Sequence, residues 1–194
     1  LVEEKRLLET IRALPVKRSP LPDEEHRRGL RETEELLASR LRELGHEPVM
    51  QEFVWTYMLR KVNEPAAEPG VPDESGKGSL PALTEKDATF RNIIVDLPGG
   101  DLKHEVLIVS AHLDAVPNCP GADDDGTGVA AVLELARVLK DRPTRRTIRL
   151  ALFNLEEAGL VGANHYVSEW VKRSKEPASG RATKERIFGM MSLE

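Results

Sequence analysis

Three stretches of almost continuous apolar residues predict buried β-strands in the second half of the chain. They cover residues 105–111, 147–154 and 187–193, and unbroken apolar runs are typical of strands covered on both faces. Apolar residues at helical spacing predict helices over residues 126–140 and about 160–173. This alternation predicts an α/β fold, a three-layer sandwich with a mostly parallel central sheet flanked by helices.

The N-terminal third has the pattern of scaffold elements. Residues 1–14 and 23–44 have the spacing of charged amphipathic helices. Asp23 is expected to cap the second of these helices, and Gly45 to end it. Residues 49–58 alternate between apolar and polar enough to predict an edge strand.

Length and composition predict one catalytic domain over residues 1–194, with a loop insertion at 63–85. The insertion is rich in proline and glycine and offers little that could pack. An apolar content of 40% is enough for a core, and an aromatic content of only 4% means a core of Leu, Val, Ile and Ala.

Charge and hydropathy exclude several classes of partner. The net charge is −5, and no basic cluster is paired with aromatic residues, which argues against nucleic-acid binding. No apolar run approaches the roughly 18–20 residues of a membrane span, and no signal peptide is visible. The single cysteine, Cys119, excludes an internal disulfide. Oligomeric state is not encoded in these features.

Histidine and carboxylate side chains follow the predicted central strands or precede the helix between them. The candidates are His112, Asp114, Asp124, Glu156, Glu157 and Glu194. In parallel α/β sheets, ligands bind outside the carboxyl ends of the strands. We therefore expect these side chains to converge at one edge of the sheet and to form a hydrolytic metal site.

The residue types suit this chemistry. Imidazole and carboxylate without thiolate are typical ligands of a catalytic zinc ion. Asp114, two residues after His112, is placed to accept the free N–H of that ring and to fix its tautomer. Adjacent Glu156 and Glu157 point in different directions along an extended backbone. One of them can therefore bind metal while the other acts as a general base.

Each motif also has a simpler interpretation. A lone His112 is more often a packed histidine than a ligand, and the acidic run 123–125 is also typical of a turn or helix cap. That run lacks the spacing of a calcium loop. The pair Glu156–Glu157 could open a helix. All of these would have to coincide at one sheet edge, which favours the metal site.

Four segments carry a resemblance to a known family: Arg91–Val95, His112–Asp114, Gly121–Gly128 and Glu156–Gly162. Over roughly residues 90–194 the chain resembles zinc-dependent aminopeptidases with a co-catalytic metal pair, whose relatives include glutamate carboxypeptidase and glutaminyl cyclase. The step of twelve residues from His112 to Asp124 fits the bacterial leucyl aminopeptidase branch.

The resemblance implies a role for each candidate and a site for two zinc ions. It implies that Asp124 bridges the ions, that His112 and Glu157 are terminal ligands, that Glu156 is the general base, that Asp114 supports His112, and that Glu194 binds the ion held by His112. The substrate it implies is a peptide or aminoacyl compound, cleaved at the N-terminal peptide bond through a metal-bridging water activated by Glu156.

The chain departs from the family pattern in one respect. The family contributes a second histidine well after the position of Glu194, and the chain stops there. We therefore expect an N-terminal portion of a longer zinc metallopeptidase, and we expect the isolated chain of 194 residues to be inactive.

Two other functions stay open at this stage. One is a related amide hydrolase or a glutaminyl cyclase-type acyltransferase. The sequence of residues 112–117 is also similar to that of aminoacylase-type hydrolases. The other is a non-catalytic receptor or binding homologue, although a receptor has no use for a cluster of mutually repelling carboxylates. The family resemblance favours secretion or the cell envelope as the location.

Overall fold

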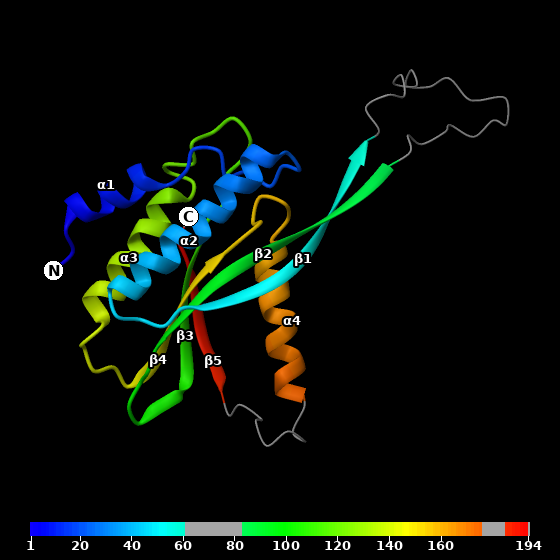
Figure 1. The fold of residues 1–194 in the computed structure, drawn as a ribbon. Coiled ribbons are helices and arrows are strands. Elements are labelled where there is room, and N and C mark those ends of the chain that lie inside the picture. The colour runs from blue at the N-terminus through cyan, green and yellow to red at the C-terminus, as the bar shows by residue number, and fades with distance from the viewer. Residues whose placement is uncertain (61–82, 176–184, 194) are drawn as a thin grey trace, which may run out of the picture. The chain divides into compact units, whose positions relative to one another are not determined.

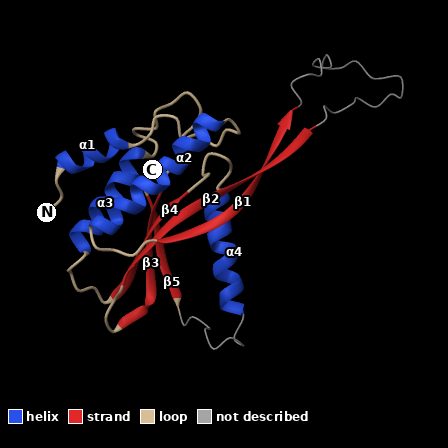
Figure 2. Ribbon diagram, viewed as in Figure 1, coloured by secondary structure: helices blue, strands red, loops and turns tan. Residues whose placement is uncertain are grey.

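A five-stranded sheet with four helices forms the fold, in a computed structural model that describes residues 1–60, 83–175 and 185–193 (Figures 1 and 2). In chain order the elements are α1 (Glu4–Ala13), α2 (Glu24–Glu43), β1 (Val49–Arg60), β2 (Leu83–Leu97), β3 (Leu102–His112), α3 (Gly126–Leu139), β4 (Arg146–Phe153), α4 (Val161–Lys175) and β5 (Arg186–Ser192).

The sheet has the strand order β1-β2-β4-β3-β5 and is mixed. β3 runs parallel to both β4 and β5, whereas β2 runs antiparallel to β4. The expectation of a mostly parallel sheet is wrong in this respect, because the sequence pattern did not single out β2. Only residues 98–101 join β2 to β3, and parallel strands need a crossover of a dozen or more residues. β2 must therefore run in the opposite direction to β3.

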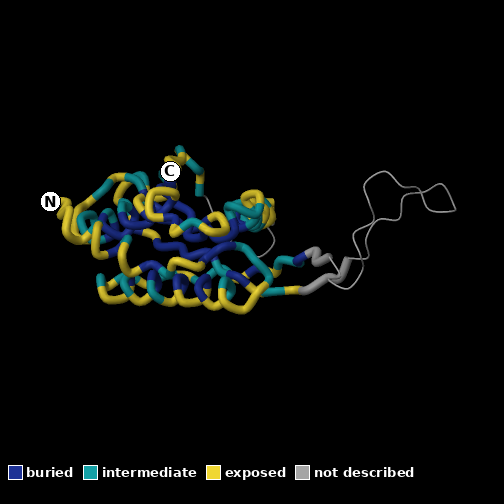
Figure 3. The backbone as a smooth tube through the Cα atoms, turned by 90° about the horizontal axis from the view of Figure 1, so that it is seen from above, coloured by how far each residue is buried: buried dark blue, intermediate teal, exposed yellow. Residues whose placement is uncertain are grey.

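Helices cover both faces of the sheet, which confirms the three-layer architecture (Figures 1 and 3). On one face α3 packs against β3 and β4 and is itself covered by α1 and α2. On the other face α4 places the buried Tyr166 against Val106, Ile108, Ala151 and Phe153 of β3 and β4. β3 and β4 are thus buried from both sides, as their unbroken apolar sequences predict.

The predicted helices and strands lie where the sequence places them, within a few residues. The strand predicted at 187–193 is β5, which is an edge strand and mostly exposed, so the expectation that it is buried is wrong. Asp23 is the N-cap of α2 and accepts a hydrogen bond from the backbone N–H of His26 at 3.0 Å. Gly45 adopts a φ of 81° directly after α2, a left-handed conformation that favours glycine. β1 is an edge strand of the sheet, as its alternating pattern predicts.

The chain divides into two compact units, Leu1–Phe53 with Phe90–Glu194 and Val54–Thr89. Within the smaller unit, Thr56 donates a hydrogen bond to Asp87 at 2.8 Å. The predicted insertion at 63–85 falls mostly outside the described residues, and its last three residues begin β2. Among the helices that the structure describes, none has the length and apolarity to cross a membrane.

Candidate metal centre

The carboxyl ends of β3 and β4 lie side by side and bring the candidate residues together. His112 and Phe153 are register partners at these ends. The backbone N–H of Leu113 continues the pairing by donating to the carbonyl of Phe153 at 2.9 Å. The segments that follow the two strands therefore leave the sheet at the same edge, as the topology predicts.

His112 is buried and surrounded by carboxylates. Its Nε2 atom lies 2.8 Å from Oδ1 of Asp124, and its Nδ1 atom lies 3.4 Å from Oδ1 of Asp114. Burial alone would lower the pKa of His112, but Asp114, followed by Asp124 and Asp125, raises it to about 9. Without metal the imidazole is therefore a cation at neutral pH, because its surroundings favour positive charge.

Asp114 joins the two segments of the site. Its side chain is fully buried, and it accepts the backbone N–H of Glu156 at 3.0 Å and that of Glu157 at 3.1 Å. The sequence predicts Asp114 as the partner of the His112 ring. The structure adds that the same carboxylate binds the backbone after β4. Its two oxygens therefore hold the backbone of Glu156 and of Glu157 in place.

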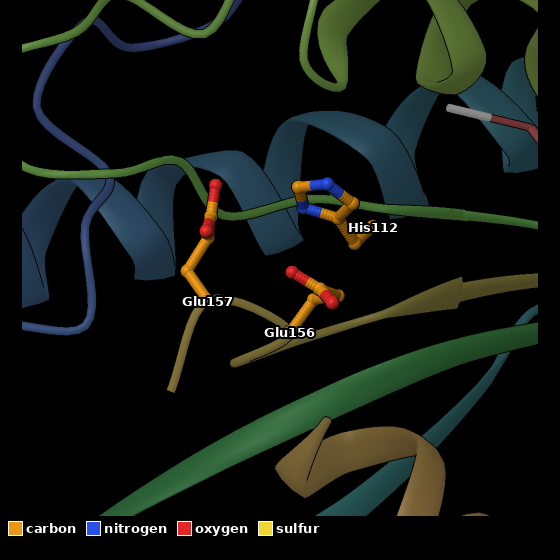
Figure 4. A group of neighbouring side chains, drawn as sticks. All are labelled: His112, Glu156 and Glu157. Carbon is orange, nitrogen blue, oxygen red and sulfur yellow. The ribbon is translucent and has the colours of Figure 1, made fainter. Parts of the chain in front are cut away.

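Glu156 and Glu157 extend toward His112 from the segment after β4 (Figure 4). One ligand atom from each of His112, Glu156 and Glu157 lies within 4.8 Å of the others. Burial, followed by the charge of Asp124, raises the pKa of Glu157. Its Oε1 atom is buried and accepts no hydrogen bond from the described residues. A cation at this position would satisfy that oxygen, so the side chains present fit a metal ion.

The acidic run before α3 serves both as a helix cap and as part of the site. Asp125 is the N-cap of α3 and accepts the backbone N–H of Gly128 at 2.9 Å; its other oxygen accepts the backbone N–H of His112 at 2.9 Å. Asp124 precedes it through a cis peptide bond, and its side chain is 68% exposed while reaching His112. Asp125 is therefore the cap of α3, and it also binds the backbone of His112.

The structure brings five of the six predicted residues to one place. His112, Asp114, Asp124, Glu156 and Glu157 gather at the edge formed by β3 and β4. The sixth, Glu194, lies outside the described residues. Its role as a ligand stays a prediction.

Two buried asparagines that the sequence analysis did not assign a role hold the turn after β4. The side-chain oxygen of Asn92 accepts the backbone N–H of Asn154 at 3.0 Å, and its amide donates to the carbonyl of Gly162 at 2.9 Å. Asn154 in turn donates to Glu34 at 2.8 Å. Leu155 adopts a φ of 56°, which turns the chain toward the site. Asn154 could have been found from the sequence, because it is a polar residue directly after an apolar strand.

Sequence comparison places the second half of the chain among known peptidases. Residues 92–183 match peptidase family M28. Aminopeptidase YwaD of Bacillus subtilis is 45% identical over 89 residues, which are 45% of this chain and 19% of that protein. The probable lipoprotein aminopeptidase LpqL of Mycobacterium tuberculosis is 44% identical over 88 residues, 44% of this chain and 17% of that protein. The matched segments therefore span less than a fifth of these relatives.

Solved structures share the fold over most of the chain. A zinc aminopeptidase from Bacillus subtilis superposes with a TM-score of 0.61 and 21% identity, covering 87% of this chain and 65% of that one. An aminopeptidase from an Aneurinibacillus strain gives 0.69 and 17%, covering 98% and 70%. A glutaminyl cyclase from Fimbriiglobus ruber gives 0.63 and 21%, covering 98% and 61%. At these identities the likeness establishes the fold.

The fold and the cluster at its edge define an α/β protein with the architecture of the zinc aminopeptidases. Within that class, residues 92–183, slightly less than half of the chain, match peptidase family M28. The family resemblance that the motifs indicate is thereby confirmed.

Proposed function

We propose that the protein is a zinc-dependent aminopeptidase that removes residues from the N-terminus of peptides. The observation that carries the proposal is the convergence of His112, Glu156 and Glu157 at the carboxyl edge of β3 and β4. The family match and the names of the two relatives support the choice of reaction.

His112, Asp124 and Glu157 would hold the metal, with Asp124 between two ions and Glu194 as a further ligand. The donor set of one imidazole and several carboxylates suits zinc. The buried Oε1 of Glu157, which accepts no hydrogen bond from the described residues, is an oxygen that a bound cation would satisfy. When bound, zinc supplies Lewis-acid polarisation of the scissile carbonyl and of the attacking water.

Glu156 would move the proton. Its backbone N–H is fixed by Asp114 at 3.0 Å, so the side chain begins from a rigid point beside Glu157. As general base it takes a proton from the attacking water, and as general acid it returns that proton to the leaving amine. Asp114 would hold His112 while this happens. A carboxylate that binds metal has little remaining basicity, which is why one glutamate is assigned to each task.

Release of a chromophore from aminoacyl p-nitroanilides tests the proposal. We expect turnover that disappears after treatment with a chelator and returns with zinc. An N-acetylated substrate is the control, because an aminopeptidase requires the free amine. Cleavage of C-terminal residues or of acylated amino acids would indicate a related amide hydrolase. Cyclisation of N-terminal glutamine without peptide cleavage would indicate a glutaminyl cyclase.

We also propose a location at the cell envelope or outside the cell. The support is that one of the relatives is named as a lipoprotein. Fractionation of cells that express the full-length protein, followed by immunoblotting, tests this. Recovery of the protein only with cytoplasmic markers would contradict it.

A further inference from the structure

Arg18 lies in the connection between α1 and α2 and has an unusual environment for a cation. Its side chain is 1% exposed, and its hydrogen bonds go to backbone carbonyls. Nε donates to Leu113 at 2.9 Å, Nη1 to Pro15 at 3.1 Å and to Pro120 at 2.5 Å, and Nη2 to Gly121 at 2.5 Å. One guanidinium therefore binds three separate pieces of backbone.

Two of these pieces carry the candidate metal ligands. Leu113 lies between His112 and Asp114, and Gly121 lies three residues before Asp124. The main chain of Arg18 adds to the first attachment, because its carbonyl accepts the backbone N–H of Ala115 at 3.2 Å. The segment after β3 and the loop before α3 are thus tied together through Arg18.

The positive charge of Arg18 lies near the buried carboxylates of the site. Its guanidinium donates to backbone carbonyls rather than to a carboxylate. Asp114 and Asp125, both fully buried, are nevertheless near enough to favour its charged form, while burial lowers its pKa. The cation therefore offsets part of the negative charge that the metal-free site concentrates.

We infer that Arg18 is a positioning residue for the metal centre, holding the segment of His112 and Asp114 at the distance from the Asp124 loop that zinc requires. This inference rests on the proposed function. The planar guanidinium, with donors in a fixed fork, reaches carbonyls on both segments at once, whereas a lysine ammonium is a single point charge. The hydrogen bonds of Arg18 go to the backbone around the candidate ligands and not to their side chains.

The test compares Arg18→Lys with Arg149→Lys. Arg149 is the matched control, since it is also a buried arginine but binds Asp96 and Tyr166 on the α4 face. Affinity for zinc is measured by competition with a chromophoric chelator, and folding stability by urea unfolding of the metal-free protein. We expect Arg18→Lys to weaken zinc binding by roughly 10–100-fold, the loss typical when a group that orients ligands is removed. Arg149→Lys should lower stability and leave zinc affinity within about twofold.

A second variant and a second readout complete the design. Arg18→Gln carries the test if the lysine variant does not fold, because glutamine keeps a donor without burying an ammonium. The visible spectrum of the cobalt-loaded protein should change in the Arg18 variants and not in Arg149→Lys, since it reports ligand geometry. Wild-type zinc affinity and an unchanged spectrum in a folded Arg18 variant would overturn the inference. Absence of zinc binding by the wild-type protein would overturn the proposed function itself, and the inference with it.

Discussion

The buried carboxylate of Asp125 accepts the backbone N–H of His112 at 2.9 Å, so the cap of α3 is bonded directly to the end of β3. The same side chain accepts the N–H of Gly128 through its other oxygen. A Cβ at Gly128 would collide with this carboxylate, which explains why glycine stands there. Helix, strand and candidate metal ligand are thus coupled through one side chain.

Replacement of Asp125 by alanine should therefore cost more than the loss of an ordinary cap. A helix cap contributes about 0.5–2 kcal/mol, and a buried N–H left without an acceptor costs about 1–3 kcal/mol. We expect the free energy of unfolding to fall by about 2–4 kcal/mol, measured in urea. Asp23→Ala, which removes the exposed cap of α2, is the control and should cost no more than about 2 kcal/mol. Equal losses in both variants would show that the bond to His112 contributes nothing.

Glu156 and Glu157 should differ in what their removal affects. Glu156→Gln keeps the size and removes the base, so zinc content should persist while turnover falls by roughly 10²–10⁴-fold. Glu157→Gln should instead lower zinc occupancy. Elemental analysis of the purified variants, together with rates on an aminoacyl p-nitroanilide, separates the two effects. Unchanged hydrolysis by Glu156→Gln would exclude it as the base.

The sequence predicts that the candidate side chains converge because they come from one local unit; their roles stay predictions. Unbroken apolar runs define β3 and β4, and parallel strands bring their carboxyl ends together, so the meeting of His112 with Glu157 follows from topology. The direction of β2 is not predictable from its own residues, since it depends on the short connection to β3. Arg18 was missed for another reason. Its partners lie 95 to 103 residues away, or within three residues, and all are backbone carbonyls, which leave no trace in a side-chain pattern.

Zinc titration of the 194-residue chain should show unequal binding of two ions. On the proposed assignment, His112, Asp124 and Glu194 would hold one ion, whereas only Asp124 and Glu157 would hold the second. Carboxylates without imidazole fix zinc poorly, so the second equivalent should bind more weakly and turnover should be low. Isothermal titration and the aminoacyl assay measure both quantities. Two equally tight equivalents with full turnover would contradict the prediction.

Glu34 should make folding stability depend on pH. Burial raises its pKa to about 7 from the ordinary 4.5, although Arg91 and Asn154 donate hydrogen bonds to it. Between about pH 4.5 and 7 the Glu34 carboxyl therefore keeps its proton in the folded state, whereas the unfolded state has released it. The stability from this group is fully present below about pH 4.5 and is lost as the pH rises toward 7, by up to about 3 kcal/mol.

Urea unfolding at pH 5 and pH 7.5 tests this for wild type and Glu34→Gln. Glutamine keeps the shape and an acceptor but does not titrate, so wild type should lose stability relative to this variant between the two pH values. Glu35→Gln is the control, because Glu35 is an exposed neighbour that also binds Arg91. If the difference in free energy of unfolding between wild type and Glu34→Gln is the same at both pH values, the raised pKa of Glu34 is contradicted.

The attachment of Arg18 has a consequence for the order in which the molecule assembles. Asp114 and Glu157 meet across 43 residues, within the unit β3–α3–β4, whereas Arg18 and Gly121 meet across 103. Short loops close at a lower entropic cost, and contacts between distant residues form late. The edge that gathers the carboxylates can therefore form before the N-terminal segment arrives. Local unfolding of the Arg18 segment would release the two ligand-bearing loops while the sheet stays folded. This segment therefore has its own opening equilibrium, separate from global unfolding.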